Sequence, residues 1–222
     1  MIKIDLNKDM CDEIDKFVAT MVKEADFRPN FFDNSEERSP GEIQENAIEG
    51  KYAELGFYQY IQGTKYESNK INLDIYQRGK WDAGDFKITY RDTTYQVEIK
   101  SSSMKSRCLL LPCESMRLTS DNKVYFYDKN NCPDWVIGVR IDTKHRVVEL
   151  AGKVTNKDLC HAIKNPETYC WRAGQKIPGT SISLKVDNYV WVFPNFKERV
   201  NKNSDRIVIQ TQEFIDKRRN LK

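Results

Sequence analysis

The sequence predicts an α+β fold, in which helices flank a central mixed β-sheet within one domain. Helical apolar periodicity occupies much of residues 1–61, strand-like alternation begins near residue 71, and the later elements do not alternate regularly. A length of 222 residues is enough for one such domain with a substantial core. We expect residues 1–40 to form an N-terminal helix and loop, 41–145 the core that carries the motifs below, and 146–222 C-terminal strands, a short helix and a basic tail.

Two helices are predicted in the first part of the chain. Residues 8–25 place a set of apolar side chains on one helical face, namely Ile14, Phe17, Val18, Met21 and Val22. A second helix should begin at Pro40, because Ser39 is a suitable N-cap and Glu42 completes a capping box with it. This helix is expected to end near Ile61.

Strand-like alternation is clearest around a polar turn at residues 91–94. The segments 85–90 and 95–100 flank this turn and together predict a β-hairpin. Further strands are expected at 71–75, 124–127, 135–141, 147–151, 181–186, 189–193 and 206–210. Of these, 135–141 is apolar enough to be central in the sheet. Thr155 and Asp158 predict the start of a short helix over 156–163.

The charge of the chain is unevenly distributed. Residues 1–54 hold 7 basic and 14 acidic residues, whereas residues 55–222 hold 29 basic and 19 acidic residues, a balance of +10. Lysine and arginine contacts to phosphate supply most nonspecific nucleic-acid affinity, so the charge of residues 55–222 is compatible with a polyanionic partner. An ordinary solvated surface would give the same balance.

Several classes of site are disfavoured by composition. Only His145 and His161 are present, which argues against histidine-based catalysis and imidazole ligation. The six cysteines contain no C-x-x-C pair, so we expect no zinc and reduced thiols in the cytoplasm. No apolar run reaches the roughly 18 residues of a membrane-spanning helix, and the acidic start differs from a signal peptide. We therefore expect no membrane association.

Three ionisable residues of the hairpin are predicted to cluster. A turn centred near Asp92 and Thr93 pairs residues whose numbers sum to roughly 185, which places Asp85 across from Lys100. Glu98 and Lys100 are two residues apart on one strand, so their side chains leave the same face. The intervening residues, Val97 and Ile99, are expected to face a hydrophobic core.

This combination of side chains favours metal-dependent hydrolysis. Two neighbouring carboxylates repel each other unless a cation joins them, and carboxylate oxygens with water are the ligands that Mg²⁺ prefers. A lysine beside the metal orients or deprotonates an attacking water and stabilises phosphoryl charge. Phosphodiester hydrolysis by such a site requires no histidine.

The segment from Asp85 through Glu98-Ile99-Lys100 resembles the D…(D/E)-x-K signature of the PD-(D/E)xK nuclease superfamily, which includes restriction endonucleases and Holliday-junction resolvases. Gly84 stands where the superfamily's name has Pro. The resemblance implies a restriction-endonuclease-like core and a metal-dependent DNA endonuclease that uses Mg²⁺, with Mn²⁺ as a substitute. It also implies that Asp85 and Glu98 bind the metal and that Lys100 acts in catalysis.

Members of this superfamily often carry a further glutamate on a preceding helix. Glu54, in Gly50-Lys51-Tyr52-Ala53-Glu54, resembles that residue, and Gly50 would let the helix approach the sheet closely. Glu49 is the competing choice, about 140° away around the helix. Asp82 is an alternative to Asp85, although it is also suited to a turn.

The resemblance leaves the wider role of the protein open. Ser101, Ser102 and Lys105 follow the Glu-x-Lys strand and are expected to contact DNA phosphate, although ordinary loop polarity also explains them. Double-strand cleavage commonly uses two active sites, which favours a homodimer. The main alternative function is a catalytically inactive nucleic-acid-binding or interaction module on the same fold. A weaker alternative is an α+β domain that binds no nucleic acid.

Overall fold

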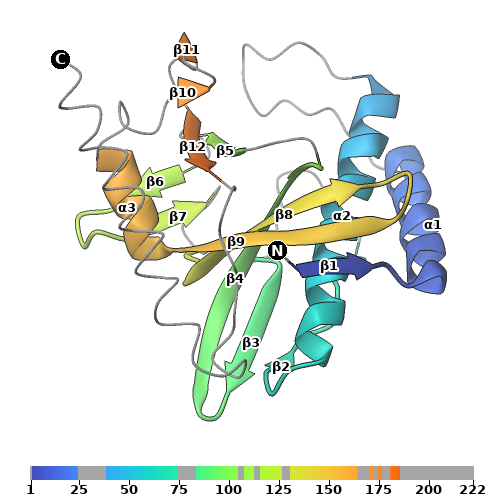
Figure 1. The fold of residues 1–222 in the computed structure, drawn as a ribbon, viewed down its shortest axis with the longest axis horizontal. Helices are drawn as coiled ribbons and strands as arrows, with labels where there is room; N and C mark the ends of the chain where they lie inside the picture. Colours follow the sequence, from blue (N-terminus) through green and yellow to red (C-terminus); the bar gives the residue numbers. More distant parts are fainter. Residues whose placement is uncertain are drawn as a thin grey trace.

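A six-stranded mixed β-sheet, in the order β1-β9-β8-β4-β3-β2, forms the centre of the computed structural model (Figure 1). Its strands are β1 (Ile2–Asp5), β2 (Glu67–Ser68), β3 (Phe86–Tyr90), β4 (Thr93–Ser103), β8 (Trp135–Asp142) and β9 (Val147–Thr155). Strands β4 and β8 pair in parallel, and the other neighbours in this sheet pair antiparallel. The predicted α+β class with a central mixed sheet is therefore confirmed.

Among the described residues, the other elements are three helices and three two-stranded ribbons. The structure describes residues 2–24, 39–74, 84–104, 108–112, 116–126, 131–164, 171–172, 175–176 and 181–185. The helices are α1 (Lys8–Glu24), α2 (Pro40–Gln62) and α3 (Asn156–Lys164). The ribbons pair β6 (Met116–Leu118) with β7 (Val124–Phe126), β5 (Cys108–Pro112) with β12 (Ser181–Lys185), and β10 (Trp171–Arg172) with β11 (Gln175–Lys176).

Local capping chemistry fixes where two of the helices begin. The Ser39 side chain accepts a hydrogen bond from the Glu42 N–H, and the Glu42 carboxylate accepts one from the Ser39 N–H, so α2 starts at Pro40 as predicted. Thr155 and Asp158 form the same reciprocal pair before α3. These contacts satisfy backbone donors that lack partners within the helix.

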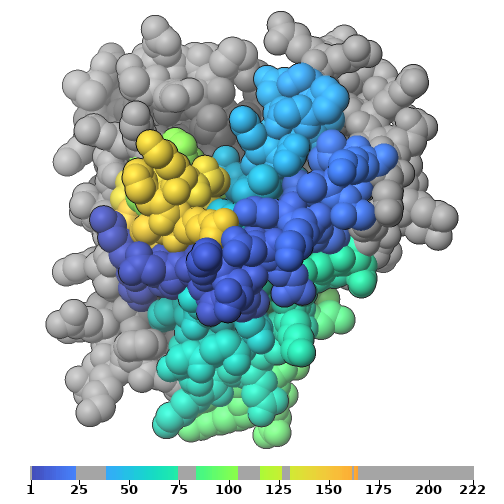
Figure 2. Space-filling model, turned by 90° about the vertical axis from the view of Figure 1, so that its right-hand side faces the viewer, coloured from blue at the N-terminus to red at the C-terminus, as the bar shows by residue number. Residues whose placement is uncertain are grey.

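The two faces of the sheet are covered by different elements. Helices α1 and α2 pack on one face over the larger hydrophobic cluster, which includes Val97 and Ile99 as predicted. Helix α3 and the β6–β7 ribbon cover the other face with a smaller cluster around Phe126 and Leu159. Figure 2 shows α1 lying across the middle of α2, beside the turn between β8 and β9. The sheet is thus a middle layer between two unequal cores.

The hairpin register differs from the predicted one by two residues. Phe86 pairs with Val97 and Tyr90 with Thr93, so paired numbers sum to 183. The prediction assumed a turn centred near Asp92 and Thr93, but the connection contains two residues, beginning at Arg91 with φ of 52°. This shorter turn places Asp85 next to Glu98 across the hairpin rather than opposite Lys100.

Other strand predictions have mixed outcomes. The expected strand at 71–75 is wrong for residues 71–74, which are irregular, and residue 75 lies outside the described residues. The strand near 181–186 is confirmed as β12. The strands predicted at 189–193 and 206–210, and the basic tail, lie outside the described residues and stay predictions.

Gly56, and not Gly50, allows α2 to lie close to the sheet. A Cβ built on Gly56 would come within 2.0 Å of Val148 Cγ2 on β9, whereas a Cβ on Gly50 has nothing within 4 Å. The expectation that Gly50 serves this approach is therefore wrong. Because α2 carries Glu54, the contact of Gly56 with Val148 determines how near that carboxylate comes to the hairpin.

We expect Gly56→Ala to lower the free energy of unfolding by about 1–3 kcal/mol, because the added methyl group overpacks the interface with β9. Gly50→Ala is the matched control and should raise stability by up to about 1 kcal/mol through its higher helix propensity. Urea unfolding of both variants measures the two effects. Equal effects of the two substitutions would contradict this assignment of the close approach.

Candidate functional site

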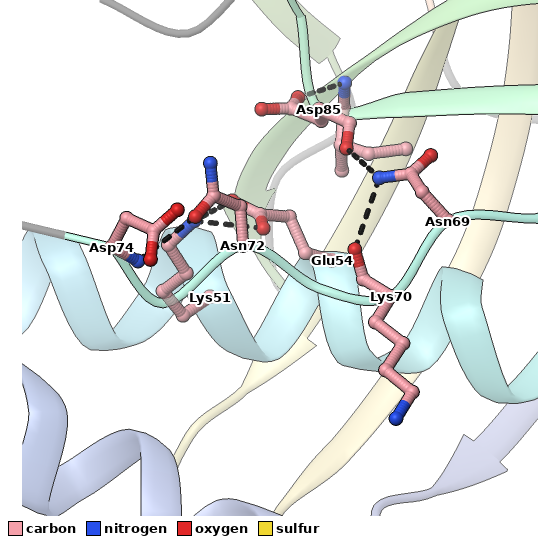
Figure 3. Close-up of polar contacts among 8 residues, drawn as sticks. Lys51, Glu54, Asn69, Lys70, Asn72, Asp74 and Asp85 are labelled. Carbon is pink, nitrogen blue, oxygen red and sulfur yellow. Dashed lines mark hydrogen bonds and ion pairs between the residues drawn. The ribbon is translucent and has the colours of Figure 1, made fainter.

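Asp85 lies immediately before β3, where its side chain continues the hydrogen-bonding ladder to β4. The Ile99 N–H donates to Asp85 Oδ2 at 2.6 Å. Asn69 holds the same backbone, because its Nδ2 donates to the Asp85 carbonyl at 3.3 Å (Figure 3). Asn69 Oδ1 also accepts from the Lys87 N–H at 2.6 Å. Strand β4 therefore holds the Asp85 carboxylate, and Asn69, which follows β2, holds the Asp85 backbone.

Glu98 and Lys100 lie on β4 and contact each other on the same face of the sheet, as predicted. Lys100 Nζ is 2.5 Å from Glu98 Oε1, and the Glu98 residue is only 4% exposed. Lys100 Nζ also lies 5.3 Å from the centroid of the Phe126 ring on β7. The ammonium group is thus placed between a buried carboxylate and an aromatic face, both of which favour its charge.

Glu54 projects from the buried half of α2 and is 7% exposed. Lys51, one turn earlier, donates to both of its carboxylate oxygens at 2.9 Å. Figure 3 shows these two side chains rising from α2 toward the region of Asp85, beside the segment that carries Asn69 and Asn72. Glu49, the competing helical acid, is partly buried, and burial raises the pKa of its carboxyl group.

Electrostatic coupling links the four predicted site residues. The pKa of Asp85 is raised well above its usual value, first by burial of the carboxylate and then by the negative charges of Glu98 and Glu54. Lys100 and the Ile99 N–H oppose this shift. Asp85 keeps some exposed surface as a residue, but its carboxylate lies deep among protein atoms. The structure therefore brings Asp85 within electrostatic range of Glu98, Glu54 and Lys100.

The carboxylates are not arranged as a finished metal cage. Across the described residues, no group of three or more His, Cys, Asp or Glu side chains has the arrangement needed to hold a metal ion. The contacts above explain this arrangement, because Glu54 is paired with Lys51 and Glu98 with Lys100. The roles predicted for Asp85, Glu98, Lys100 and Glu54 stay predictions.

One polar residue of this region, Asn131, was not predicted from the sequence. Asn131 is 5% exposed, and its Nδ2 donates to Glu98 Oε2 at 2.9 Å. No pattern in the sequence indicated it, because it belongs to a short polar stretch 33 residues away from Glu98. Only the folding of β7 against the sheet reveals the contact.

The expected DNA-contacting residues are only partly described. Ser101 and Ser102 are partly buried on β4, and the Ser102 hydroxyl oxygen is buried without a hydrogen-bond partner among the described residues. Lys105 and the alternative ligand Asp82 lie outside the described residues. Their predicted roles are neither supported nor contradicted.

Two further observations concern the cysteines and the possibility of a membrane-spanning helix. Cys11, Cys132 and Cys160 are free thiols in the described part of the chain. Within those same residues, no helix has the length and apolar character required to cross a lipid bilayer.

The pKa of Asp85 is higher in the folded state than in the unfolded chain, where an aspartate has a pKa of about 3.9. At a pH between the unfolded and the folded pKa, unfolding therefore releases the Asp85 proton. The stability of the wild type in EDTA should therefore fall as pH rises through this window. Asp85→Asn removes the buried charge, so its Tm should exceed the wild-type Tm by at least ~2 °C at pH ~8, with a smaller gap near pH ~4.

Asp121→Asn is the control for the titration of Asp85. Asp121 is an exposed aspartate, and its hydrogen bond from Thr119 lowers its pKa, so this substitution should bring no gain in Tm at high pH. Parallel pH profiles for the wild type and Asp85→Asn would show that no strained carboxylate is present at this position.

Comparison with known proteins gives no family assignment. No protein-family model matches this chain, and no curated protein matches it. Similar solved structures include the bacterial homing endonuclease I-Ssp6803I, with 12% identity over 78% of this chain and 96% of that chain, at a TM-score of 0.34. They also include MepB, with 12% identity over 71% of this chain and 89% of that chain, at a TM-score of 0.25. With likenesses this distant, the functional argument depends on the site itself.

Proposed function

We propose that this protein is a metal-dependent DNA endonuclease with a restriction-endonuclease-like core. The observation that carries the proposal is the convergence of Asp85 at the start of β3 with the Glu98–Lys100 pair on β4, within electrostatic range of Glu54 on α2. Carboxylates in such proximity destabilise a fold unless a cation or a proton relieves them, so clusters of this kind are typical of functional sites.

The donor set suits a hard divalent cation. Asp85 and Glu98 would hold Mg²⁺, or Mn²⁺ in its place, and Glu54 would be a further ligand once its contact with Lys51 is released. The buried Asn131 Oδ1, which has no hydrogen-bond partner among the described residues, adds an unsatisfied neutral oxygen to the same region. When bound, the cation would supply Lewis-acid stabilisation of negative charge on the scissile phosphate.

The side chains of the protein would perform the remaining tasks. Lys100 is held by Glu98 with its ammonium group toward the site, so its N–H groups can orient a water for attack on phosphorus. The same positive charge would stabilise the oxygens of the phosphoryl group as they gain charge in the transition state. The Phe126 ring covers one side of this ammonium and favours its charge.

DNA is the proposed substrate because the chain outside residues 1–54 has a balance of +10, which suits a phosphate backbone. We also propose a cytoplasmic location, which is supported by the free thiols of Cys11, Cys132 and Cys160. A homodimer stays a prediction that follows from the needs of double-strand cleavage.

One observation favours a second candidate function, a catalytically inactive module on the same fold that binds nucleic acid. Glu54 is fully engaged by Lys51, and the described carboxylates form no finished metal group. A protein that had lost catalysis would keep such internal ion pairs. Binding to DNA without any cleavage would be its signature.

The two candidates differ in their response to metal removal. The endonuclease should nick or linearise plasmid DNA with Mg²⁺ or Mn²⁺. It should be inactive with EDTA, because the site then lacks the cation whose positive charge stabilises the transition state. Gel electrophoresis of supercoiled plasmid measures this difference. Salt-sensitive DNA binding with no cleavage under either metal would favour the inactive module.

Lys100→Ala should lower the cleavage rate by about 10²–10³-fold or more, since it removes a donor that acts in the transition state. DNA affinity in EDTA should be largely unchanged. Lys123→Ala is the matched control, because Lys123 is an exposed lysine paired with Asp121 and should leave cleavage at the wild-type level. Undiminished metal-dependent cleavage by Lys100→Ala would remove Lys100 from the proposed mechanism.

A further inference from the structure

We infer that Asn131 is a positioning residue for Glu98, an assignment that rests on the proposed metal-dependent function. Its side-chain amide fixes the Glu98 carboxylate in the orientation needed to bind the cation. Asn131 is buried and lies outside the D…E-x-K pattern, and it contacts Glu98, a carboxylate that is also paired with Lys100.

The two oxygens of Glu98 have different donors. Oε1 lies 2.5 Å from Lys100 Nζ, and Oε2 accepts from Asn131 Nδ2 at 2.9 Å. Two donors from different elements prevent the carboxylate from rotating about its terminal bond. Hydrogen bonds of this kind to ligating carboxylates are a common means of orienting metal ligands.

A backbone bridge holds Asn131 in this place. The Phe126 N–H donates to the Asn131 carbonyl at 2.7 Å, and these residues form an isolated β-bridge. The Phe126 ring in turn lies against Lys100 Nζ. The bridge therefore places the Asn131 amide against Glu98 and the Phe126 ring against Lys100. In this way the β6–β7 ribbon, which carries Phe126, supports the site directly.

The other end of the amide indicates more than a structural role. Asn131 Oδ1 is buried and has no hydrogen-bond partner among the described residues. It faces Gly84, where an added Cβ would lie 3.2 Å from it, directly before Asp85 in the chain. An unsatisfied buried acceptor costs free energy, and its persistence beside candidate metal ligands suits a site that is completed by a bound cation or its water.

The orientation of the amide follows from the chemistry of its neighbour. An ionised carboxylate only accepts hydrogen bonds, so the Asn131 amide must turn its NH₂ group, rather than its oxygen, toward Glu98. This leaves Oδ1 beside Gly84, the residue that precedes Asp85. The unpaired oxygen is thus a consequence of holding Glu98.

Calorimetric titration of the full-length protein with Mn²⁺, without DNA, tests the inference. Asn131→Ala and the nearly isosteric Asn131→Leu remove the donor to Glu98 Oε2, and each should raise the Kd for Mn²⁺ by about 10–100-fold. Asn156→Ala is the matched control. Asn156 is also a polar residue with several hydrogen bonds, but it contacts the backbone of Val124 and Pro133 rather than Glu98.

The Asn156→Ala control should lower the Tm of the protein without changing its Kd for Mn²⁺. If the wild type binds Mn²⁺ and Asp85→Asn does not, an unchanged Kd in Asn131→Leu overturns the positioning role while the proposed function stands. If the wild type binds no Mn²⁺, the proposed function fails and the inference fails with it. Loss of cooperative melting in both Asn131 variants would show a structural role and would also overturn the inference.

Discussion

The buried Asp85 carboxylate, at the junction of α2 with the β3–β4 hairpin, is the constraint on which the site depends. Burial raises its pKa first, and the negative charges of Glu98 and Glu54 raise it further. Each carboxylate has its own protein donor, namely the Ile99 N–H for Asp85, Lys100 with Asn131 for Glu98, and Lys51 for Glu54. These contacts let the fold tolerate the cluster without a cation, and two of the donors are lysines that a divalent cation would have to displace or share.

The architecture of the domain explains why these residues meet. The hairpin supplies Asp85 and Glu98 from adjacent strands, and the parallel pairing of β4 with β8 buries the base of the hairpin in the middle of the sheet. Helix α2 can bring Glu54 to the same place because Gly56 has no side chain to separate it from Val148. On the opposite face, the β6–β7 ribbon places Phe126 near the Glu-x-Lys pair. The site thus depends on contacts from both layers that cover the sheet.

Much of the fold was predictable because its signals are local. The capping box at Ser39 and Glu42 and the apolar run from Trp135 depend on residues close in sequence, and both predictions are confirmed. The proximity of Asp85 to Glu98 and Lys100 was also predicted, but the register was wrong by two residues because turn length is not specified by strand alternation. Gly56 and Asn131 were missed because their importance comes from Val148 and Glu98, which are distant in sequence. Such contacts have no signature in one sequence.

A crystal structure of the protein with Mn²⁺, with the ion located by anomalous scattering, would show whether Asp85, Glu98 and Glu54 bind a cation. We expect one anomalous peak bounded by these three carboxylates, with Lys51 moved away from Glu54. An ion bound elsewhere, or no peak at saturating Mn²⁺ with the Lys51–Glu54 pair intact, would contradict this expectation.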